Sequence, residues 1–115
     1  MIQANEVRLG NWIMEVPEKR FVQLQDLIQT EYSYLLNGLG LEFFRAILLT
    51  TELLVKSGFK NQFDCWYVGD FILRESFEEL FYHPNGKNVG QQIEYLHQLQ
   101  NIYFVITAEE LEIDI

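Results

Sequence analysis

Three residues of the C-terminal half have the types and the spacing of metal ligands. Glu75, Glu79 and His83 recur every fourth residue, so a helix would present two carboxylates and an imidazole on one face, where they could hold a divalent ion. The aromatic residues between them fit a strand as readily as a helix, which favours a solvated acidic surface instead. We keep the three as candidate metal ligands and assign no cofactor.

A second polar group consists of His97, Gln98, Gln100 and Asn101, which share the turns of a predicted helix. A neutral imidazole at His97 could act as a base or bind a ligand. No cysteine, serine or carboxylate stands in a recognisable catalytic spacing to it, so we name no catalytic residue. We expect this polar face to form hydrogen bonds within the fold.

Cys65 is the single cysteine of the sequence, which excludes an internal disulfide and is typical of a reducing compartment. The charge beside it is that of Asp64, whereas a nucleophilic thiol needs an electropositive and partly open setting. We therefore expect Cys65 to be a buried, unreactive thiol.

The sequence contains no P-loop, dinucleotide-binding fingerprint, paired CxxC or GxSxG motif. Trp12, Trp66 and Tyr67 could stack on nucleic-acid bases if a sheet exposed them, but core packing is the usual role of aromatic residues at strand spacing. The lack of these motifs favours a non-enzymatic protein and leaves enzymatic activity open.

The elements that carry these residues are predicted to be short strands and two helices. Gly10-Asn11 indicates a turn between two strands, and Gly69-Asp70 indicates a β-hairpin. The spacing within residues 21–36 fits a helix as well as a strand, so we leave the structure beyond residue 24 open. Strands are predicted at residues 6–9, 12–14, 20–24, 65–68, 71–73 and 79–82, with turns at 17–19 and 84–86 and a loop at 37–40.

Residues 50–59 predict a short central helix. Thr50 can cap the free N–H groups of the first turn, and the charges of both ends suit the helix dipole. Gly58 can take the left-handed conformation that ends a helix, after which Phe59 folds back onto it.

The C-terminal helix is predicted from about residue 95 to 107. Its core face is expected to consist of Leu96, Leu99, Tyr103 and Ile106. Residues 109–115 alternate acidic and apolar side chains, which predicts a terminal edge strand whose charges oppose aggregation.

Length and composition indicate one domain. The chain has 115 residues, 49% of them hydrophobic, which is enough to bury a core without a metal or a disulfide. It shows neither a signal peptide nor an apolar run that could span a membrane, so we expect a cytoplasmic protein. Residues 1–63 hold seven acids and six bases, but residues 64–115 hold ten acids and two bases. This negative charge disfavours direct nucleic-acid binding through the C-terminal half.

Three blocks of the sequence resemble a group of small uncharacterised proteins of Bacteroidetes, of a type found in prophages and other mobile elements. Residues 6–12 (EVRLGNW) resemble their ELRIGN-like start, and residues 46–59 (AILLTTELLVKSGF) resemble their PIPLTEEWLLKFGF-like centre. Residues 93–104 (IEYLHQLQNIYF) are similar to the start of their YVHQLQNLYFALTGEEL-like C-terminus. The resemblance supports the fold and the location, and it implies no catalytic residue.

The sequence departs from this pattern at a few positions. Ala46 and Leu48 replace prolines, which makes the approach to the central helix less rigid, and Leu53 replaces a tryptophan. Ala108 replaces the glycine after the last helix, so a left-handed stop there would be strained. The alternative is a capping box over residues 107–110 that starts a further turn.

We therefore predict a single α+β domain over residues 1–115. A meandering, partly rolled antiparallel sheet packs on the C-terminal amphipathic helix, with one short central helix. For function we expect a non-enzymatic interaction or accessory module of a bacterial mobile element, which binds another protein or a second copy of itself. Two alternatives stay open: an acidic mimic of nucleic acid that inhibits a DNA-binding protein, and a small metal-dependent enzyme.

Overall fold

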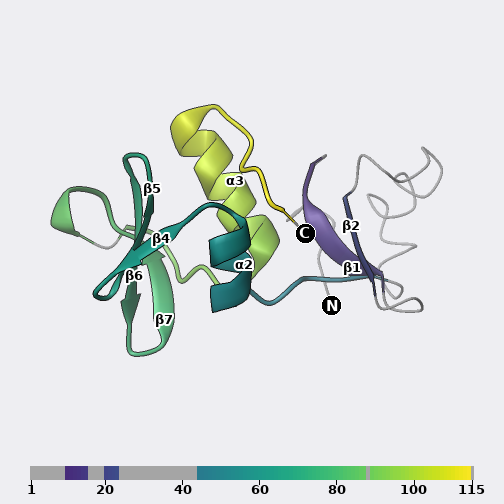
Figure 1. Cartoon of the computed structure of the whole chain (residues 1–115), viewed down its shortest axis with the longest axis horizontal. Helices are drawn as coiled ribbons and strands as arrows, with labels where there is room; N and C mark the ends of the chain where they lie inside the picture. Colours follow the sequence, from purple (N-terminus) through teal and green to yellow (C-terminus); the bar gives the residue numbers. More distant parts are fainter. Residues whose placement is uncertain (1–9, 16–19, 24–43, 88, 115) are drawn as a thin grey trace. The chain divides into compact units, whose positions relative to one another are not determined.

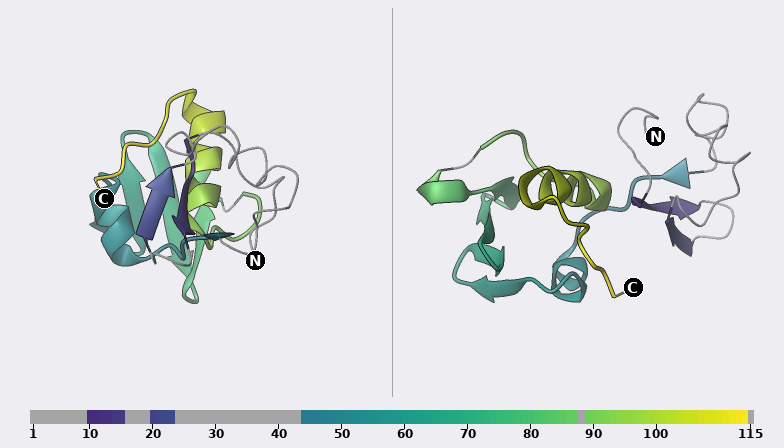
Figure 2. Two further views of the ribbon diagram at one scale, coloured as in Figure 1. Left: turned by 90° about the vertical axis from the view of Figure 1, so that its right-hand side faces the viewer. Right: turned by 90° about the horizontal axis from the view of Figure 1, so that it is seen from above.

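The computed structural model describes residues 10–15, 20–23, 44–87 and 89–114. The strands in these ranges form two antiparallel sheets, accompanied by two α-helices and a short 3-10 helix, η4 (Pro84–Gly86) (Figures 1 and 2). This confirms the predicted α+β class, with its short central helix and its C-terminal helix. The strands are divided between two sheets, whereas the sequence pattern predicts one.

The chain divides into two compact units, Met1–Leu48 with Tyr95–Ile102 (unit 1) and Leu49–Glu94 with Tyr103–Ile115 (unit 2). The C-terminal helix α3 (Leu96–Thr107) contributes its first turns to unit 1 and its last turn to unit 2. Among the described residues, neither helix has the length and apolar character needed to cross a membrane.

Unit 1 contains a three-stranded sheet in the order β2-β1-β3. The central strand β1 (Trp12–Glu15) pairs with β2 (Arg20–Gln23) and with β3 (Phe44–Arg45). Ile13 and Val22 are opposite each other and both are buried, because alternate residues of paired strands face the same side. The predicted strand at 12–14 is confirmed, and the one predicted at 20–24 is confirmed as far as residue 23, the last that is described there. Outside the described residues lie the predicted strand at 6–9, the turn at 17–19, the open stretch beyond residue 24 and the loop at 37–40.

The start of α3 is fixed by hydrogen bonds within unit 1. The Leu96 N–H donates to the Ile47 carbonyl at 2.8 Å. The Gln98 side-chain oxygen accepts from the Tyr95 N–H at 2.9 Å, which is half of a capping box. Leu96 and Leu99 are fully buried, as predicted for the core face of this helix.

The end of α3 differs from the prediction. Ile106 is 49% exposed, so the predicted core face of Leu96, Leu99 and Tyr103 does not extend to this residue. The predicted edge strand is also absent from the described part of the tail, residues 109–114. The tail is held instead by a buried side chain, Leu111, and by the Asp114 N–H, which donates to the Lys56 carbonyl at 2.9 Å.

Unit 2 begins with the predicted short helix, α2 (Thr51–Lys56). The Thr50 hydroxyl accepts from the Leu53 N–H at 3.2 Å and so caps the first turn. At the other end Gly58 takes a φ of +86°, and its N–H donates to Val55 while the Phe59 N–H donates to Leu54. This pair of bonds is the Schellman motif, so the predicted glycine stop is confirmed.

A four-stranded meander in the order β4-β5-β6-β7 follows α2 (Figure 1). The Gly69 turn between β5 and β6 has a φ of +55° at its first central residue, as a type II′ hairpin requires. The predicted strands at 65–68, 71–73 and 79–82 are confirmed. The strand bounds are Lys60–Gln62 (β4), Cys65–Val68 (β5), Phe71–Ser76 (β6) and Glu79–Tyr82 (β7).

One face of this sheet forms the core of unit 2. Trp66, Leu73 and Leu80 are buried on it, and Phe71 lies among three aromatic rings. The Phe71 ring centroid is 4.9 Å from that of Tyr82, 5.0 Å from Tyr103 and 6.1 Å from Phe59. Tyr103 therefore belongs to the core, although its helical neighbours Phe104, Val105 and Ile106 are exposed.

The residue after α3, Ala108, adopts a φ of +61°, and its N–H donates to the Phe104 carbonyl at 2.8 Å. It is thus the strained left-handed stop, and the alternative of a further turn does not form. We expect Ala108→Gly to raise the free energy of unfolding by about 0.5–1 kcal/mol, because glycine enters this conformation without a Cβ penalty. Urea unfolding measures the change. Gly58→Ala is the matched reverse substitution and should destabilise the protein by a similar amount; a loss of stability in Ala108→Gly would contradict the assignment.

Candidate functional site

The side-chain amide of Gln100 is buried against the turn that precedes β1. Its oxygen accepts from the Trp12 N–H at 2.8 Å, and its nitrogen donates to the Gly10 carbonyl at 3.0 Å. Gln100 is 1% exposed, so both polar atoms are satisfied inside the protein. Beside it, the Asn11 amide donates to the Asn101 side-chain oxygen at 2.8 Å. The two amides join residues about ninety positions apart in the sequence.

His97 is fully buried in the same turns of α3. Its ring is stacked on that of Tyr95, with centroids 6.0 Å apart and an interplanar angle of 15°. Because no part of this side chain reaches the surface, it does not offer a base or a ligand to a substrate in solvent. The hydrogen bonds of Gln98, Gln100 and Asn101 show that the polar face of the HQLQN string is used within unit 1.

The candidate metal ligands lie on strands, so their fourth-residue spacing does not bring them together. Glu75 is in β6, Glu79 begins β7 and His83 follows β7. The register places Glu75 on the core side of the sheet, where its carboxylate accepts from the Trp66 indole N–H at 2.7 Å. Glu79 lies on the opposite side. Within the described residues, no three His, Cys, Asp or Glu side chains are grouped so that they could hold a metal ion.

Cys65 lies on the solvent side of β5 and is half-buried, less than predicted. Burial raises the pKa of its thiol, and the neighbouring Asp64 carboxylate, which accepts from the S–H at 3.6 Å, raises it further. Asp64 is itself paired with the Arg74 guanidinium at 3.0 Å, and this hydrogen bond lowers the pKa of Asp64. The thiol is therefore held in its neutral form, which fits the predicted low reactivity.

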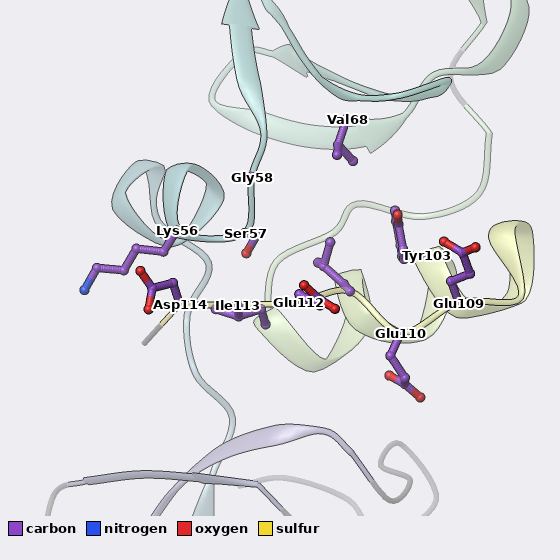
Figure 3. Close-up of a pocket in the computed structure, with 11 residues that line it drawn as sticks. Lys56, Ser57, Gly58, Val68, Tyr103, Glu109, Glu110, Glu112, Ile113 and Asp114 are labelled. Atoms are coloured by element: carbon purple, nitrogen blue, oxygen red, sulfur yellow. The ribbon is translucent and has the colours of Figure 1, made fainter.

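A cavity of about 530 Å3 lies between α2 and the tail that follows α3 (Figure 3). Figure 3 shows the Glu109 and Glu110 carboxylates pointing in opposite directions, and the Lys56 ammonium pointing away from the hollow. The carboxylates are thus spread along the tail and do not converge on one ligand atom. The acidic residues that line this cavity are Glu109, Glu110, Glu112 and Asp114.

The most exposed apolar side chains of the described residues are two phenylalanines in the turns of the four-stranded sheet. Phe63, in the turn between β4 and β5, is 91% exposed, and Phe77, between β6 and β7, is 99% exposed. Both residues have positive φ, +58° and +53°. The Glu75 N–H donates to the Asp64 carbonyl at 2.8 Å, so the two turns occupy the same end of the sheet. This pair was not predicted from the sequence. Its only signal there is a phenylalanine between two short strands, at a position where glycine, proline, asparagine, aspartate or serine is usual.

The buried amide of Gln100 gives a test with a matched control. Gln100→Glu keeps the size but places a carboxylate oxygen against the Gly10 carbonyl, so we expect a loss of roughly 3 kcal/mol or more in unfolding free energy. Gln98→Glu keeps the acceptor for the Tyr95 N–H at the positive end of the helix dipole, and should change stability by less than about 0.5 kcal/mol. Chemical denaturation of both variants measures the difference. Equal effects would contradict the buried role of Gln100.

The thiol gives a test by alkylation. Asp64→Asn removes the acceptor and the negative charge that raise the pKa of Cys65, so the thiolate fraction below that pKa increases. We expect iodoacetamide to modify this variant faster than the wild type near neutral pH, with the difference vanishing well above the pKa of both thiols. Glu79→Gln removes a carboxylate from the same side of the sheet and should leave the rate unchanged. A slower reaction in Asp64→Asn would show that the carboxylate does not suppress ionisation.

The comparisons with known proteins do not assign a family. No family model, curated protein or solved structure matches the chain. The resemblance to the Bacteroidetes proteins therefore stays a prediction.

Proposed function

We propose that the protein is a non-enzymatic interaction module that binds another protein through the turn between β6 and β7. The observation that carries this proposal is Phe77, a phenylalanine 99% exposed in a left-handed backbone conformation. The next residue, Glu78, is also left-handed, with a φ of +67°. Together they form a two-residue hairpin turn with positive φ at both central positions, which sequences such as Asn-Gly fill at least cost.

The backbone conformation of this turn lowers the stability of the protein. A residue with a side chain in the left-handed conformation costs roughly 1–2 kcal/mol, and a solvated phenylalanine ring recovers none of it by burial. Strained residues of this kind are concentrated at functional sites. Aromatic residues, phenylalanine among them, are also enriched at the core of protein interfaces relative to the rest of the surface. Both features support a role for Phe77 in binding.

The charges beside Phe77 indicate the chemistry of its partner. Glu78 and Glu79 follow it directly and are exposed, so the apolar ring is presented with two carboxylates. A pocket that accepts the ring would be apolar and rimmed by lysine or arginine. The same carboxylates oppose docking on an anionic membrane surface. We place this role in the cytoplasm, which the single cysteine favours, and the sequence blocks that resemble mobile-element proteins support an accessory role.

Phe77→Gly separates binding from folding. Glycine relieves the strain of the turn, so we expect the free energy of unfolding to rise by about 0.5–1 kcal/mol while partner binding is lost. Binding is measured in the cells that naturally produce the protein, with a tagged chain that carries a photo-crosslinking phenylalanine analogue at position 77. Untagged wild-type protein or untagged Phe77→Gly is added as a competitor for the partner. The wild type should suppress the adduct, and the variant should not.

The control position for crosslinking is Val105, which is 78% exposed on α3 in the same unit. An analogue placed there should give no specific adduct. If positions 77 and 105 yield the same adducts, or if Phe77→Gly competes as well as the wild type, the turn is not a binding site.

A second candidate is mimicry of nucleic acid, which the tail supports. Leu111 is buried and anchors residues 109–114, while Glu109, Glu110 and Glu112 are exposed, so the carboxylates are held in place. Negative charges spread along an anchored tail could occupy a groove that normally binds phosphates. Pull-down from a cell lysate at low and high salt distinguishes the two functions, because mimicry predicts capture that is abolished at high salt and unaffected by Phe77→Gly.

A further inference from the structure

The solvent side of the four-stranded sheet carries a shallow cavity. The register of β5 and β6 places Cys65, Tyr67 and Ile72 on the side opposite the buried Trp66 and Leu73. These three side chains are half-buried and line a hollow of about 490 Å3. We call this hollow the outer-face cavity. Among the described residues, no helix, strand or tail segment contributes to its lining except the sheet itself and its turns.

Phe63 stands at the rim of the outer-face cavity. It is one of the residues that line it, yet it is 91% exposed, so its ring borders the hollow without filling it. Its φ of +58° is the strained conformation that a turn position normally reserves for glycine. This surface is self-complementary, because it carries both a protruding ring and a hollow that can receive the same ring of a second copy. This is the arrangement that a two-fold interface requires, because each copy supplies the same surface to the other.

The charges around the cavity fit a second copy as well. Asp64 follows Phe63, and Arg74 is directly opposite Cys65 in the register, with the two charged groups 3.0 Å apart within one chain. Lys60 and Glu79 lie on the same side of the sheet. Asp64 and the three charged residues that the register places on this side are two acids and two bases, although the whole chain has a formal net charge of −9. Repulsion between two copies is weakest across such a balanced surface, and Asp64 of one copy can exchange its pairing for the Arg74 of the other.

We propose that a second copy of this chain docks on the solvent side of the sheet about a two-fold axis, with the Phe63 ring of each copy in the outer-face cavity of the other. The interface uses residues of β4, β5, β6 and the turn at Phe63. It does not need the Phe77 turn, so this proposal and the proposed function can fail separately.

The test is the oligomeric state of the full chain, measured by sedimentation velocity over a range of concentrations. We expect a reversible dimer for the wild type. Phe63→Gly removes the ring and relieves the positive φ, so the variant should stay folded while its dimer dissociation constant rises by roughly thirtyfold or more. Phe77→Gly is the matched control, because it removes an equally exposed ring from the same end of the sheet without touching the cavity; it should remain dimeric.

The single cysteine gives an independent readout. Maleimide can modify the chain only at Cys65, which lines the cavity and which the Phe63 ring of the second copy covers in the dimer. At concentrations where the dimer forms, modification should be slow in the wild type and in Phe77→Gly and faster in Phe63→Gly, with circular dichroism showing that all three are folded. Ile72→Lys, which places a charge in the lining, should also be monomeric. A monomeric wild type at all concentrations, a dimer that survives Phe63→Gly, or equal loss in Phe77→Gly would overturn the proposal.

Discussion

The hydrogen bonds of the Gln100 amide are the constraint on which unit 1 depends. If the Gln100 amide formed only one of its two hydrogen bonds, a buried polar atom would be left unsatisfied, which costs free energy of folding. The spacing between the Gly10 carbonyl and the Trp12 N–H therefore has to be maintained. This requirement fixes the chain where it enters β1, and thereby the pairing of β1 with its two neighbours. The string HQLQN is accordingly a structural feature: its leucine and histidine are buried, and its amides bind backbone and side-chain groups of unit 1.

Unit 2, in contrast, is stabilised by apolar packing and by residues that favour the local structure at the ends of α2. The ring of Phe71 contacts three other aromatic residues, and α2 has a capping threonine and a glycine stop. These contributions allow the sheet to tolerate phenylalanines in two of its turns. Strain of this kind persists only where the surrounding structure is strong enough to impose it. The unit with these packing contacts therefore carries the residues that we assign to binding.

The elements that could be predicted from the sequence are those whose signals are local. The helix between Thr50 and Gly58 and the hairpin at Gly69 depend on neighbouring residues, and both form as expected. The exposure of Ile106 could not be predicted, because helical periodicity shows which residues share a face but not where the neighbouring structure ends. The partners of Gln100 are distant in the sequence. The candidate metal ligands do not form a site, because a hairpin turn separates Glu75 in β6 from Glu79 in β7 and the register places the two carboxylates on opposite sides of the sheet, which a helical spacing does not foresee.

The two tryptophans of the chain fall one in each unit, Trp12 in β1 and Trp66 in β5. Trp66 is buried and its indole donates to Glu75, whereas Trp12 is partly exposed. Each unit thus contains its own intrinsic fluorophore in a distinct environment. Replacing one tryptophan at a time would make the emission of the other a report on a single unit, and coincident or separate transitions would measure how far α3, which is shared by both, makes their unfolding cooperative.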